Sequence, residues 1–387
     1  MPMTDTQRDQ ISQNFVAEAA RCQLSSPLFG AVARAAANDC DILELVSDAR
    51  PGQSQSVLLF SVVHYLLLKS PEERLARYFG SLTEAPSPPA GAFPAFKEYC
   101  LAHRADITEL LSWRTVNTNL AEKTICLVPA LRYIEAASTE PLTLLELCCS
   151  AGLNMLFDEY HYDYGDAGSV GVVNSPVQLK CRIVGSGQPP LGVMPEVAHR
   201  VGVDLVKMDL SDPNEHLWMQ AVLLPEWKIE RSRLKAALSI RAQRNLRIIE
   251  GDALKAVVPL LEELPGRLCI LMSYCQGHWS IEALTELHEV LRRASQHRDI
   301  HRLDVDPPAV ESPQAARMRL IRLAEAGIPL LKKRSPFVME YTRYTAGQAH
   351  LQQLGEGDIF GEWLNWQVTK AERPSIRSYG SVKGCEA

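Results

Sequence analysis

The segment LLELCCSAGLN, residues 144–154, decides the fold. It is an apolar run containing one acid, followed by a tight turn of small residues and an asparagine that can open a helix. This order predicts a buried strand, a turn and a helix, the repeating element of α/β proteins with parallel strands. Because open α/β sheets bind ligands at the carboxyl ends of their strands, we expect a site beside this turn.

The turn lacks the fingerprint of a dinucleotide-binding site. Cys148 and Ser150 stand at the first two glycine positions of that pattern, and only Gly152 is retained. Enzymes that transfer hydride with NAD are therefore disfavoured. Taken alone, the turn is equally well explained as a strand-to-helix connection chosen for packing.

Short apolar runs separated by glycines, acids and helical stretches continue beyond residue 141, as expected for one α/β domain spanning residues 138–387. Residues 151–160 and 313–327 have helical patterns, and residues 162–195 form an insertion in which VQLKCRIVG alternates like a strand of a hairpin. Besides residues 142–149, the strands are expected in RVGVDLV (200–206), LRIIEGDA (246–253), RLCILMSY (267–274), PFVMEYTRYT (336–345) and around EWLNWQ (362–367).

The first third of the chain is helical in pattern, with apolar residues recurring at three- and four-residue spacing. We expect residues 1–137 to form a helical cap domain. A serine followed by Pro27 predicts one helix start. The most apolar segment, VLLFSVVHYLLL (57–68), is shorter than the roughly 20 residues that cross a bilayer, so it is interpreted as a buried helix.

The composition favours a folded protein with a ligand that is not nucleic acid. The 387 residues are 46% hydrophobic and 22% charged, with a net charge of -6, whereas nucleic-acid binding usually needs an excess of basic residues. The ten cysteines contain no Cys-x-x-Cys pair, and the start MPMTDTQRDQ has no signal-peptide pattern. We therefore expect a cytoplasmic protein without membrane spans.

Acids close three of the expected strands. Glu146 lies near the end of the first, Asp204 ends the second, and Asp252 with Ala253 follows the third. A carboxylate at a strand end can accept hydrogen bonds from the two hydroxyls of a ribose, and the third position can contact an adenine edge. Together the acids predict a nucleoside site. Each acid alone is as well explained as a loop carboxylate or a helix cap.

The sequence resembles a known family at several places. LLELCCSAGLNMLFDEYHYDYG, PEVAHRVGVDL and EGDA, preceded by VVHYLLL and TVNTNLAEKTICLVPAL, look like the bacterial family catalogued as domain of unknown function 2332, over residues 26 to about 274 and again at EWLNWQ. That family resembles S-adenosylmethionine-dependent methyltransferases with a helical amino-terminal extension. The resemblance implies a Rossmann-like, methyltransferase-type sheet. Cys148 stands where relatives usually carry glycine.

The resemblance also implies a site for S-adenosyl-L-methionine, without a metal. The expected cofactor-binding residues are Glu146, Cys148, Ser150, Gly152, Asp204, Asp252, Ala253 and Ser273. Tyr160, Tyr162 and Tyr164 follow the turn closely and can shield a sulfonium cation, although packing explains them equally well.

Three residues are candidates for chemistry. Asn154 can hold a substrate amine or the cofactor carboxylate, although it is also an ordinary capping residue. Tyr162 and Asp209 are candidate general bases.

The expected reaction is methyl transfer to a small-molecule acceptor. Internal displacement by the cofactor's own amine, giving azetidine-2-carboxylate and methylthioadenosine, and a non-catalytic nucleotide-binding protein are the alternatives. The sequence leaves the acceptor and the oligomeric state open.

Overall fold

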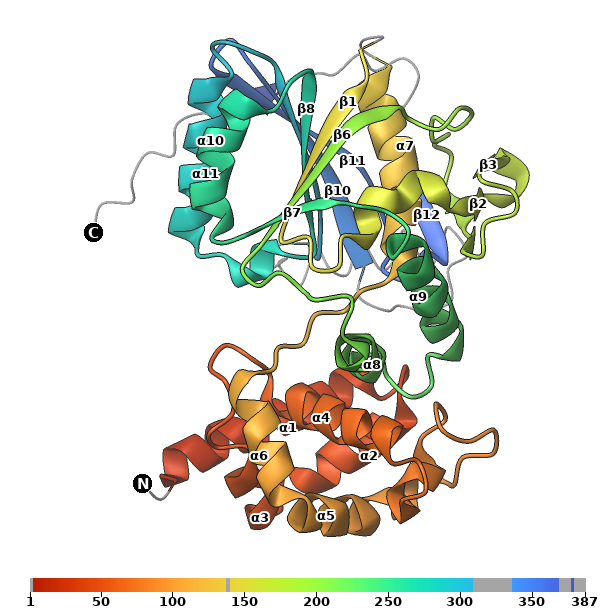
Figure 1. Cartoon of the computed structure of the whole chain (residues 1–387), viewed down its shortest axis with the longest axis vertical. Coiled ribbons are helices and arrows are strands. Elements are labelled where there is room, and N and C mark those ends of the chain that lie inside the picture. Colours follow the sequence, from red (N-terminus) through yellow and green to blue (C-terminus); the bar gives the residue numbers. More distant parts are fainter. Residues whose placement is uncertain (1–2, 137–139, 309–335, 369–376, 379–387) are drawn as a thin grey trace. The chain divides into compact units, whose positions relative to one another are not determined.

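The computed structural model describes residues 3–136, 140–308, 336–368 and 377–378. The chain divides into two compact units (Figure 1). The helical unit consists of Met1–Asn119 and Asp209–Leu234, and the sheet unit consists of Leu120–Met208 and Lys235–Ala387. The predicted α/β organisation is therefore present, with helices gathered in the first third of the chain.

The division between the units differs from the predicted boundary at residue 137. Helix α7 (Thr124–Glu135) belongs to the sheet unit, because Tyr164 donates a 2.7 Å hydrogen bond to the carbonyl of Ile125 and Arg267 binds carbonyls at the end of the helix. Helix α8 (Pro213–Val222), although it follows a strand of the sheet, belongs to the helical unit. Long-range packing, which local sequence patterns do not record, sets both assignments.

The helical unit is built around an apolar core of aliphatic and aromatic side chains. Helix α2 begins at Pro27 as predicted, with the Ser26 hydroxyl accepting a hydrogen bond from the amide of Phe29. The apolar segment 57–68 lies within the buried helix α4, also as predicted. Besides α8, the helices of this unit are α1 (Asp5–Cys22), α2 (Pro27–Ala36), α3 (Cys40–Leu45), α4 (Gln55–Lys69), η1 (Arg74–Tyr78), η2 (Pro89–Gly91), α5 (Ala92–Ala102), α6 (Arg104–Trp113) and the first half of α9 (Lys228–Arg241).

A search of the described helices for a membrane span gave no candidate, since each is too short or too polar to cross a bilayer.

The sheet unit begins with η3 (Ala121–Lys123) and α7 and then alternates strands with helices. Its strands are β1 (Leu142–Leu147), β2 (His161–Asp163), β3 (Ser169–Gly171), β4 (Gln178–Lys180), β5 (Arg182–Val184), β6 (Val197–Asp204), β7 (Arg247–Glu250), β8 (Arg267–Ser273), β9 (Ile300–Asp306), β10 (Pro336–Thr345), β11 (Gln348–Asp358), β12 (Trp363–Trp366) and β13 (Arg377–Ser378). Its other helical segments are η4 (Leu153–Glu159), η5 (Gly165–Ala167), α10 (Ala253–Glu263), η6 (Gln276–His278) and α11 (Ile281–Ala294).

Five neighbouring strands of the large sheet are parallel, in the spatial order β7-β6-β1-β8-β9. Strands β10 and β11 continue the sheet as an antiparallel hairpin, followed by β12 and β5. The chain places β6 and β7 on one side of β1 and then β8 and β9 on the other. This reversal creates a switch point between β1 and β8, where open α/β sheets bind their ligands.

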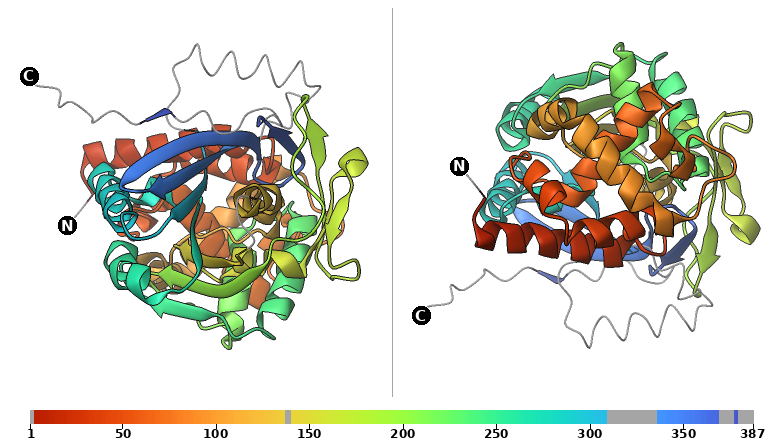
Figure 2. Two further views of the ribbon diagram at one scale, coloured as in Figure 1. Left: turned by 90° about the horizontal axis from the view of Figure 1, so that it is seen from above. Right: turned by 90° about the horizontal axis from the view of Figure 1, so that it is seen from below.

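The two faces of the large sheet carry different helices. Helices α10 and α11 lie on one face, whereas α7 lies on the other (Figures 1 and 2). Leu145 and Leu147 pack in the core shared with α10 and α11. Because side chains alternate along a strand, Glu146 points to the opposite face, which α7 covers.

Several local predictions need correction. Residues 151–160, predicted as an ordinary helix, form the 3₁₀ helix η4, whose backbone leaves the helical region at Leu156. The segment VQLKCRIVG is not one strand of a hairpin: β4 pairs with β2 in a small separate sheet, and β5 joins the edge of the large one. Strands β9 and β11 were not predicted. The helix expected at 313–327 lies outside the described residues.

Candidate functional site

Backbone strain is concentrated at the switch point. In the turn after β1, Cys148, Ser150 and Gly152 have φ angles of 58°, 49° and 76°, and Tyr274, which follows β8, has a φ of 55°. Left-handed backbone costs a non-glycine residue roughly 1–2 kcal/mol. Apart from Ala346, these are the non-glycine residues with positive φ in the described part of the chain. Strain of this kind is typical of binding and catalytic sites.

The predicted proximity of Asp204 to the turn is present in the structure. The backbone amide of Ser150 donates a 2.7 Å hydrogen bond to the Asp204 carboxylate, and the amide of Gly251 donates to the Asp204 carbonyl. The ends of β1, β6 and β7 are thereby held together. Leu205 and Val206, which follow Asp204, are 72% and 63% exposed, an apolar surface that the sequence analysis did not single out.

Glu146 and Asn154 are also brought together. Asn154 donates a 2.7 Å hydrogen bond to Oε1 of Glu146, whose side chain is only 1% exposed. Burial raises the pKa of this carboxyl to about 8, although the Asn154 hydrogen bond and the nearby Lys123 oppose the shift. Asn154 therefore orients the acid. The other oxygen, Oε2, is buried and has no hydrogen-bond partner among the described residues.

Lys123, in η3, is part of the same constellation. Its Nζ lies 4.8 Å from the centroid of the Tyr274 ring, which is within cation–π range. Burial lowers the pKa of its ammonium to about 8, and the negative charges of Glu146 and Asp306 limit the shift. Lys123 was not predicted as a site residue, because it lies about twenty residues before β1 in a segment with a helical pattern.

Asp306, the last residue of β9, supplies a second acid. Its Oδ1 accepts a 3.2 Å hydrogen bond from the amide of Gln276, whereas its Oδ2 is buried and has no hydrogen-bond partner in the part of the chain that the structure describes. Burial, with a smaller effect of the Asp304 charge, raises the pKa of Asp306 to about 7. Asp304 itself is paired with Arg302 at 2.8 Å and accepts a hydrogen bond from the Gln276 side chain.

Two hydroxyls at the end of β8 resemble the oxygens of Glu146 and Asp306 in their burial and hydrogen bonding. The Oγ of Ser273 and the hydroxyl of Tyr274 are buried, and no described residue forms a hydrogen bond with either. Nearly all buried polar atoms in folded proteins are hydrogen-bonded, so orphaned atoms need an explanation. Together with Oε2 of Glu146 and Oδ2 of Asp306, they place four such atoms at the ends of three adjacent strands. This arrangement can bind a ligand that carries hydrogen-bond donors.

The turns after β1 and β8 are joined by sulfur contacts. The indole Nε1 of Trp279 donates a 3.3 Å hydrogen bond to Sγ of Cys148, and the Cys275 thiol is hydrogen-bonded to the same sulfur. Cys148 is partly exposed, whereas Cys275 is buried. Shifted pKa values, orphaned polar atoms and strained backbone thus meet at the switch point, which makes it the candidate functional site.

The three tyrosines that follow the turn are bonded within the fold rather than placed among the unpaired groups of this site. Tyr160, Tyr162 and Tyr164 are fully buried, and the Tyr162 hydroxyl lies 2.6 Å from the carbonyl of Phe157 and 3.0 Å from the hydroxyl of Thr124. Burial raises the pKa of Tyr162 well above its ordinary value. A phenol in this position cannot serve as a general base, so the predicted catalytic role of Tyr162 is withdrawn. The three hydroxyls are bonded to backbone carbonyls, which fits packing, the alternative considered for these tyrosines.

Asp209 is also unsuited to its predicted role. It belongs to the helical unit and is exposed, and its carboxylate accepts hydrogen bonds of 2.9 Å and 2.6 Å from the amide and hydroxyl of Ser211. These bonds lower the pKa of Asp209, which weakens it as a base. Its position is that of a turn-forming residue.

Asp252 caps a helix, which is the alternative that the sequence left open for it. It is the N-cap of α10, and its Oδ1 accepts a 3.1 Å hydrogen bond from the amide of Lys255. Ala253, the first residue of that helix, is mostly buried. The two residues lie next to the end of β7, beside β6, and the bond to Lys255 uses one of the two oxygens of Asp252.

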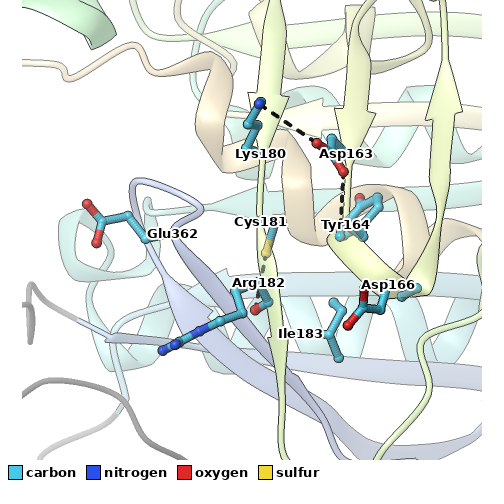
Figure 3. Close-up of a pocket in the computed structure, with 10 residues that line it drawn as sticks. Asp163, Tyr164, Asp166, Lys180, Cys181, Arg182, Ile183 and Glu362 are labelled. Atoms are coloured by element: carbon cyan, nitrogen blue, oxygen red, sulfur yellow. Dashed lines mark hydrogen bonds and ion pairs between the residues drawn. The ribbon is translucent and has the colours of Figure 1, made fainter.

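A surface cavity of about 460 Å³ lies elsewhere in the sheet unit (Figure 3). Ten residues from the insertion and the loop before β12 line it: Asp163, Tyr164, Gly165, Asp166, Ala167, Lys180, Cys181, Arg182, Ile183 and Glu362. Its ion pair, Lys180 with Asp163, is 4.0 Å long, and the lysine side chain is 79% exposed. Such a solvated pair contributes little binding energy. Of the residues predicted for the site, Tyr164 alone lines this cavity.

The chain belongs to the family described as "Uncharacterized protein conserved in bacteria (DUF2332)", whose model matches residues 12–366. This match confirms the family resemblance, extends it to residue 12 and covers the stretch between residue 274 and EWLNWQ. No curated protein matches the chain. Among the described residues, no group of three or more His, Cys, Asp or Glu side chains is placed to hold a metal ion.

Proposed function

We propose that this member of the DUF2332 family is a cytoplasmic enzyme that binds S-adenosyl-L-methionine and transfers its methyl group to a small-molecule acceptor. The observation that carries the proposal is the 2.7 Å hydrogen bond from the Ser150 amide to Asp204. An acid ending the second parallel strand, beside a tight turn after the first, is how doubly wound sheets hold a ribose. The order β7-β6-β1-β8-β9 supports a Rossmann-like, methyltransferase-type sheet.

Two further features support a small-molecule ligand and a cytoplasmic location. The net charge of -6 favours a small molecule over nucleic acid. The described cysteines are free thiols, as expected in the reducing cytoplasm.

The adenosine end of the ligand fits the residues around Asp204. One oxygen of this carboxylate holds the turn, while the other receives only a long, 3.4 Å contact from the amide of Val206 and can accept from ribose hydroxyls. The exposed side chains of Leu205 and Val206 supply an apolar surface for adenine. Asp252 and Ala253, at the end of the next strand, are assigned to the adenine edge.

The amino-acid end fits the buried charges. The ammonium group would donate to Oε2 of Glu146, the orphaned oxygen of an acid that Asn154 holds in place. The carboxylate group would take hydrogen bonds from Lys123 and from the turn at Cys148 to Gly152. Because a cationic ligand stabilises the ionised form of Glu146, its binding would lower the pKa of this acid from about 8.

The ligand, when bound, supplies a methyl carbon activated by a positively charged sulfur. The protein then has to align the acceptor, exclude water and remove a proton. We assign the last task to Asp306, because its pKa of about 7 suits a general base at neutral pH and its Oδ2 has no other hydrogen-bond partner. Ser273 and Tyr274 would contact the acceptor. Asp306 thus replaces Tyr162 and Asp209 as the candidate base.

A second candidate reaction is favoured by Glu146. Internal displacement by the cofactor's own amine, giving azetidine-2-carboxylate and methylthioadenosine, needs a base beside that amine. A buried carboxyl with a pKa of about 8, hydrogen-bonded to Asn154, is such a base. The third candidate, a nucleotide-binding protein without catalysis, is favoured by the loss of glycine at Cys148 and Ser150, where the backbone is strained.

Titration calorimetry with S-adenosyl-L-methionine tests the proposal. We expect the full chain to bind at micromolar to millimolar ligand, and Asp204→Ala to lose binding because it removes the ribose acceptor. Asp48→Ala, a change of an exposed acid in the helical unit, is the matched control and should bind like the wild type. Absence of binding to the wild type at millimolar ligand would contradict every version of the proposal.

Mass spectrometry of the protein incubated with S-adenosyl-L-methionine alone separates the three candidates. Release of methylthioadenosine without an acceptor indicates internal displacement. A cofactor that stays intact until bacterial small-molecule extract is added, and then yields S-adenosylhomocysteine, indicates methyl transfer. Tight binding with no product under either condition indicates the non-catalytic protein.

A further inference from the structure

Cys148 and Cys275 face each other across the switch point. Strands β1 and β8 are adjacent and parallel, with Leu147 opposite Met272, so the turns that carry the two cysteines leave the sheet side by side. The Cys275 thiol is hydrogen-bonded to the sulfur of Cys148, which also accepts the 3.3 Å hydrogen bond from Trp279. Cys275 belongs to the apolar cluster that includes residues of α10 and α11, and Cys148 packs against the same cluster. Cysteines in adjacent turns on one face of a sheet can approach closely enough to form a disulfide.

The two thiols are not equivalent. Cys148 is partly exposed and its sulfur receives two hydrogen bonds, whereas Cys275 is 2% exposed. The hydrogen bond from Cys275, helped by that from Trp279, lowers the pKa of Cys148 even though burial and the charges of Asp204 and Asp306 oppose the shift. The same hydrogen bond and burial raise the pKa of Cys275 well above its ordinary value. Cys148 is thus the more acidic thiol of the pair, and Cys275 is the less acidic one.

Two other cysteines, Cys149 and Cys40, do not combine partial exposure with a second thiol in the adjacent turn. Cys149 is adjacent in sequence but buried on the other side of the turn, where a Cβ added at Gly202 would lie 2.5 Å from its sulfur. Cys40 is exposed but lies in the helical unit without a neighbouring thiol that the structure pairs with it. These two residues therefore serve as internal references for a buried and an exposed thiol.

We propose that Cys148 is a site of reversible oxidation by hydroperoxides, with Cys275 as the thiol that resolves the oxidised form. In the first step the Cys148 thiolate attacks the hydroperoxide, its O–O bond breaks, and the products are a sulfenic acid and, after protonation, an alcohol or water. In the second step the Cys275 sulfur displaces the sulfenic hydroxyl, which leaves as water with the Cys275 proton, and an S–S bond forms. A cellular thiol reduces this disulfide.

The oxidation has a consequence that rests on the proposed function. The disulfide would tie the turn after β1 to the turn after β8, where the amino-acid end of S-adenosyl-L-methionine is assigned. It would also convert the free thiol of Cys148, a residue with strained backbone, into part of a covalent bridge. We therefore expect the oxidised protein to lose affinity for the ligand and the reduced protein to regain it.

Oxidation of the full chain with hydrogen peroxide tests the site independently of any cofactor. We expect the intact mass to fall by two hydrogen atoms, peptide mapping to find a bond between Cys148 and Cys275, and dithiothreitol to reverse it. Cys275→Ser should accumulate a sulfenic acid at Cys148 that dimedone traps, and Cys148→Ser should form neither product. Cys149→Ser should behave like the wild type, and thermal melts of all three variants show whether they fold.

Alkylation of the unoxidised protein provides a second measurement. At pH 7, iodoacetamide should modify Cys148 about tenfold faster than the more exposed Cys40, because a lowered pKa increases the thiolate fraction. Equal rates at the two residues, or a first disulfide that excludes Cys148, would overturn the inference. If the disulfide forms but the reduced protein does not bind S-adenosyl-L-methionine, the proposed function fails while the oxidation site stands.

Discussion

Two regions of the sheet unit were expected to line one site, and they differ in how their buried polar groups are bonded. In the tyrosine-rich segment after the turn, the hydroxyls of Tyr160, Tyr162 and Tyr164 each lie within 3.0 Å of a backbone carbonyl. At the ends of β1, β8 and β9, four polar atoms are buried without a partner. The comparison indicates that the tyrosine hydroxyls stabilise the fold through bonds to the backbone, whereas the four unpaired atoms at the strand ends are candidates for contacts with a ligand.

Replacing Glu146 should have the largest effect. Its pKa is about 8 in the folded chain and near 4.3 in an unfolded one. Between these values only the unfolded chain is ionised, so the wild type loses stability as pH rises through this window and the loss is complete above about pH 8. At that pH, Glu146→Gln should be more stable than the wild type by on the order of 5 kcal/mol, while losing ligand affinity.

Urea unfolding at pH 5 and pH 8 measures this difference. Glu44→Gln, a change of an exposed acid in the helical unit, is the control and should follow the wild type at both pH values. A wild type and a Glu146→Gln variant with the same dependence of stability on pH would show that the acid is not kept neutral by burial.

Tyr162→Phe should have the next largest effect, with the opposite sign. It removes the hydroxyl that contacts Phe157 and Thr124, and a buried acceptor left unpaired costs about 1–3 kcal/mol. The free energy of unfolding should fall by this amount, while calorimetry should find ligand affinity unchanged. If the Tyr162→Phe variant is as stable as the wild type but has lost ligand affinity, Tyr162 contacts the ligand, and the two regions do not differ as described.

Ser273→Ala should have the smallest effect on stability. The Ser273 hydroxyl is buried without a partner, so its removal should leave stability unchanged or raise it by up to about 1 kcal/mol. Thr124→Val is the matched change of a bonded hydroxyl, which donates a 2.6 Å hydrogen bond to the carbonyl of Ala121, and it should destabilise the protein. Thermal melts compare the pair, and equal losses in both variants would contradict the comparison.

The sequence allowed the prediction of those parts of the fold and site that depend on local pattern. Strands β1, β6, β7 and β8 follow from apolar runs, and the proximity of Asp204 to the turn follows from the rule that parallel strands end at one edge. Glu146 and Asn154 were found because both belong to the quoted segment. Their hydrogen bond was not foreseen, since it depends on η4 being a 3₁₀ helix.

The missed parts depend on contacts between distant residues. Strand β9 was not recognised because Arg302 and Asp304, although buried, are charged and become compatible with the core only by pairing with each other. Asp306 was therefore missed as well. Lys123 is distant in sequence from β1, and the position of Tyr162 depends on how the insertion folds. The pattern of apolar residues within one segment does not show which distant segment it will contact.

The most direct test of the account is the number of protons released when S-adenosyl-L-methionine binds at pH 7, measured by calorimetry in buffers of different ionisation enthalpy. A ligand whose ammonium meets Glu146 should ionise this acid, so we predict release of about one proton by the wild type and none by Glu146→Gln, which should also bind more weakly. Binding without proton release, or equal release by both proteins, would contradict the placement of the ligand at the switch point.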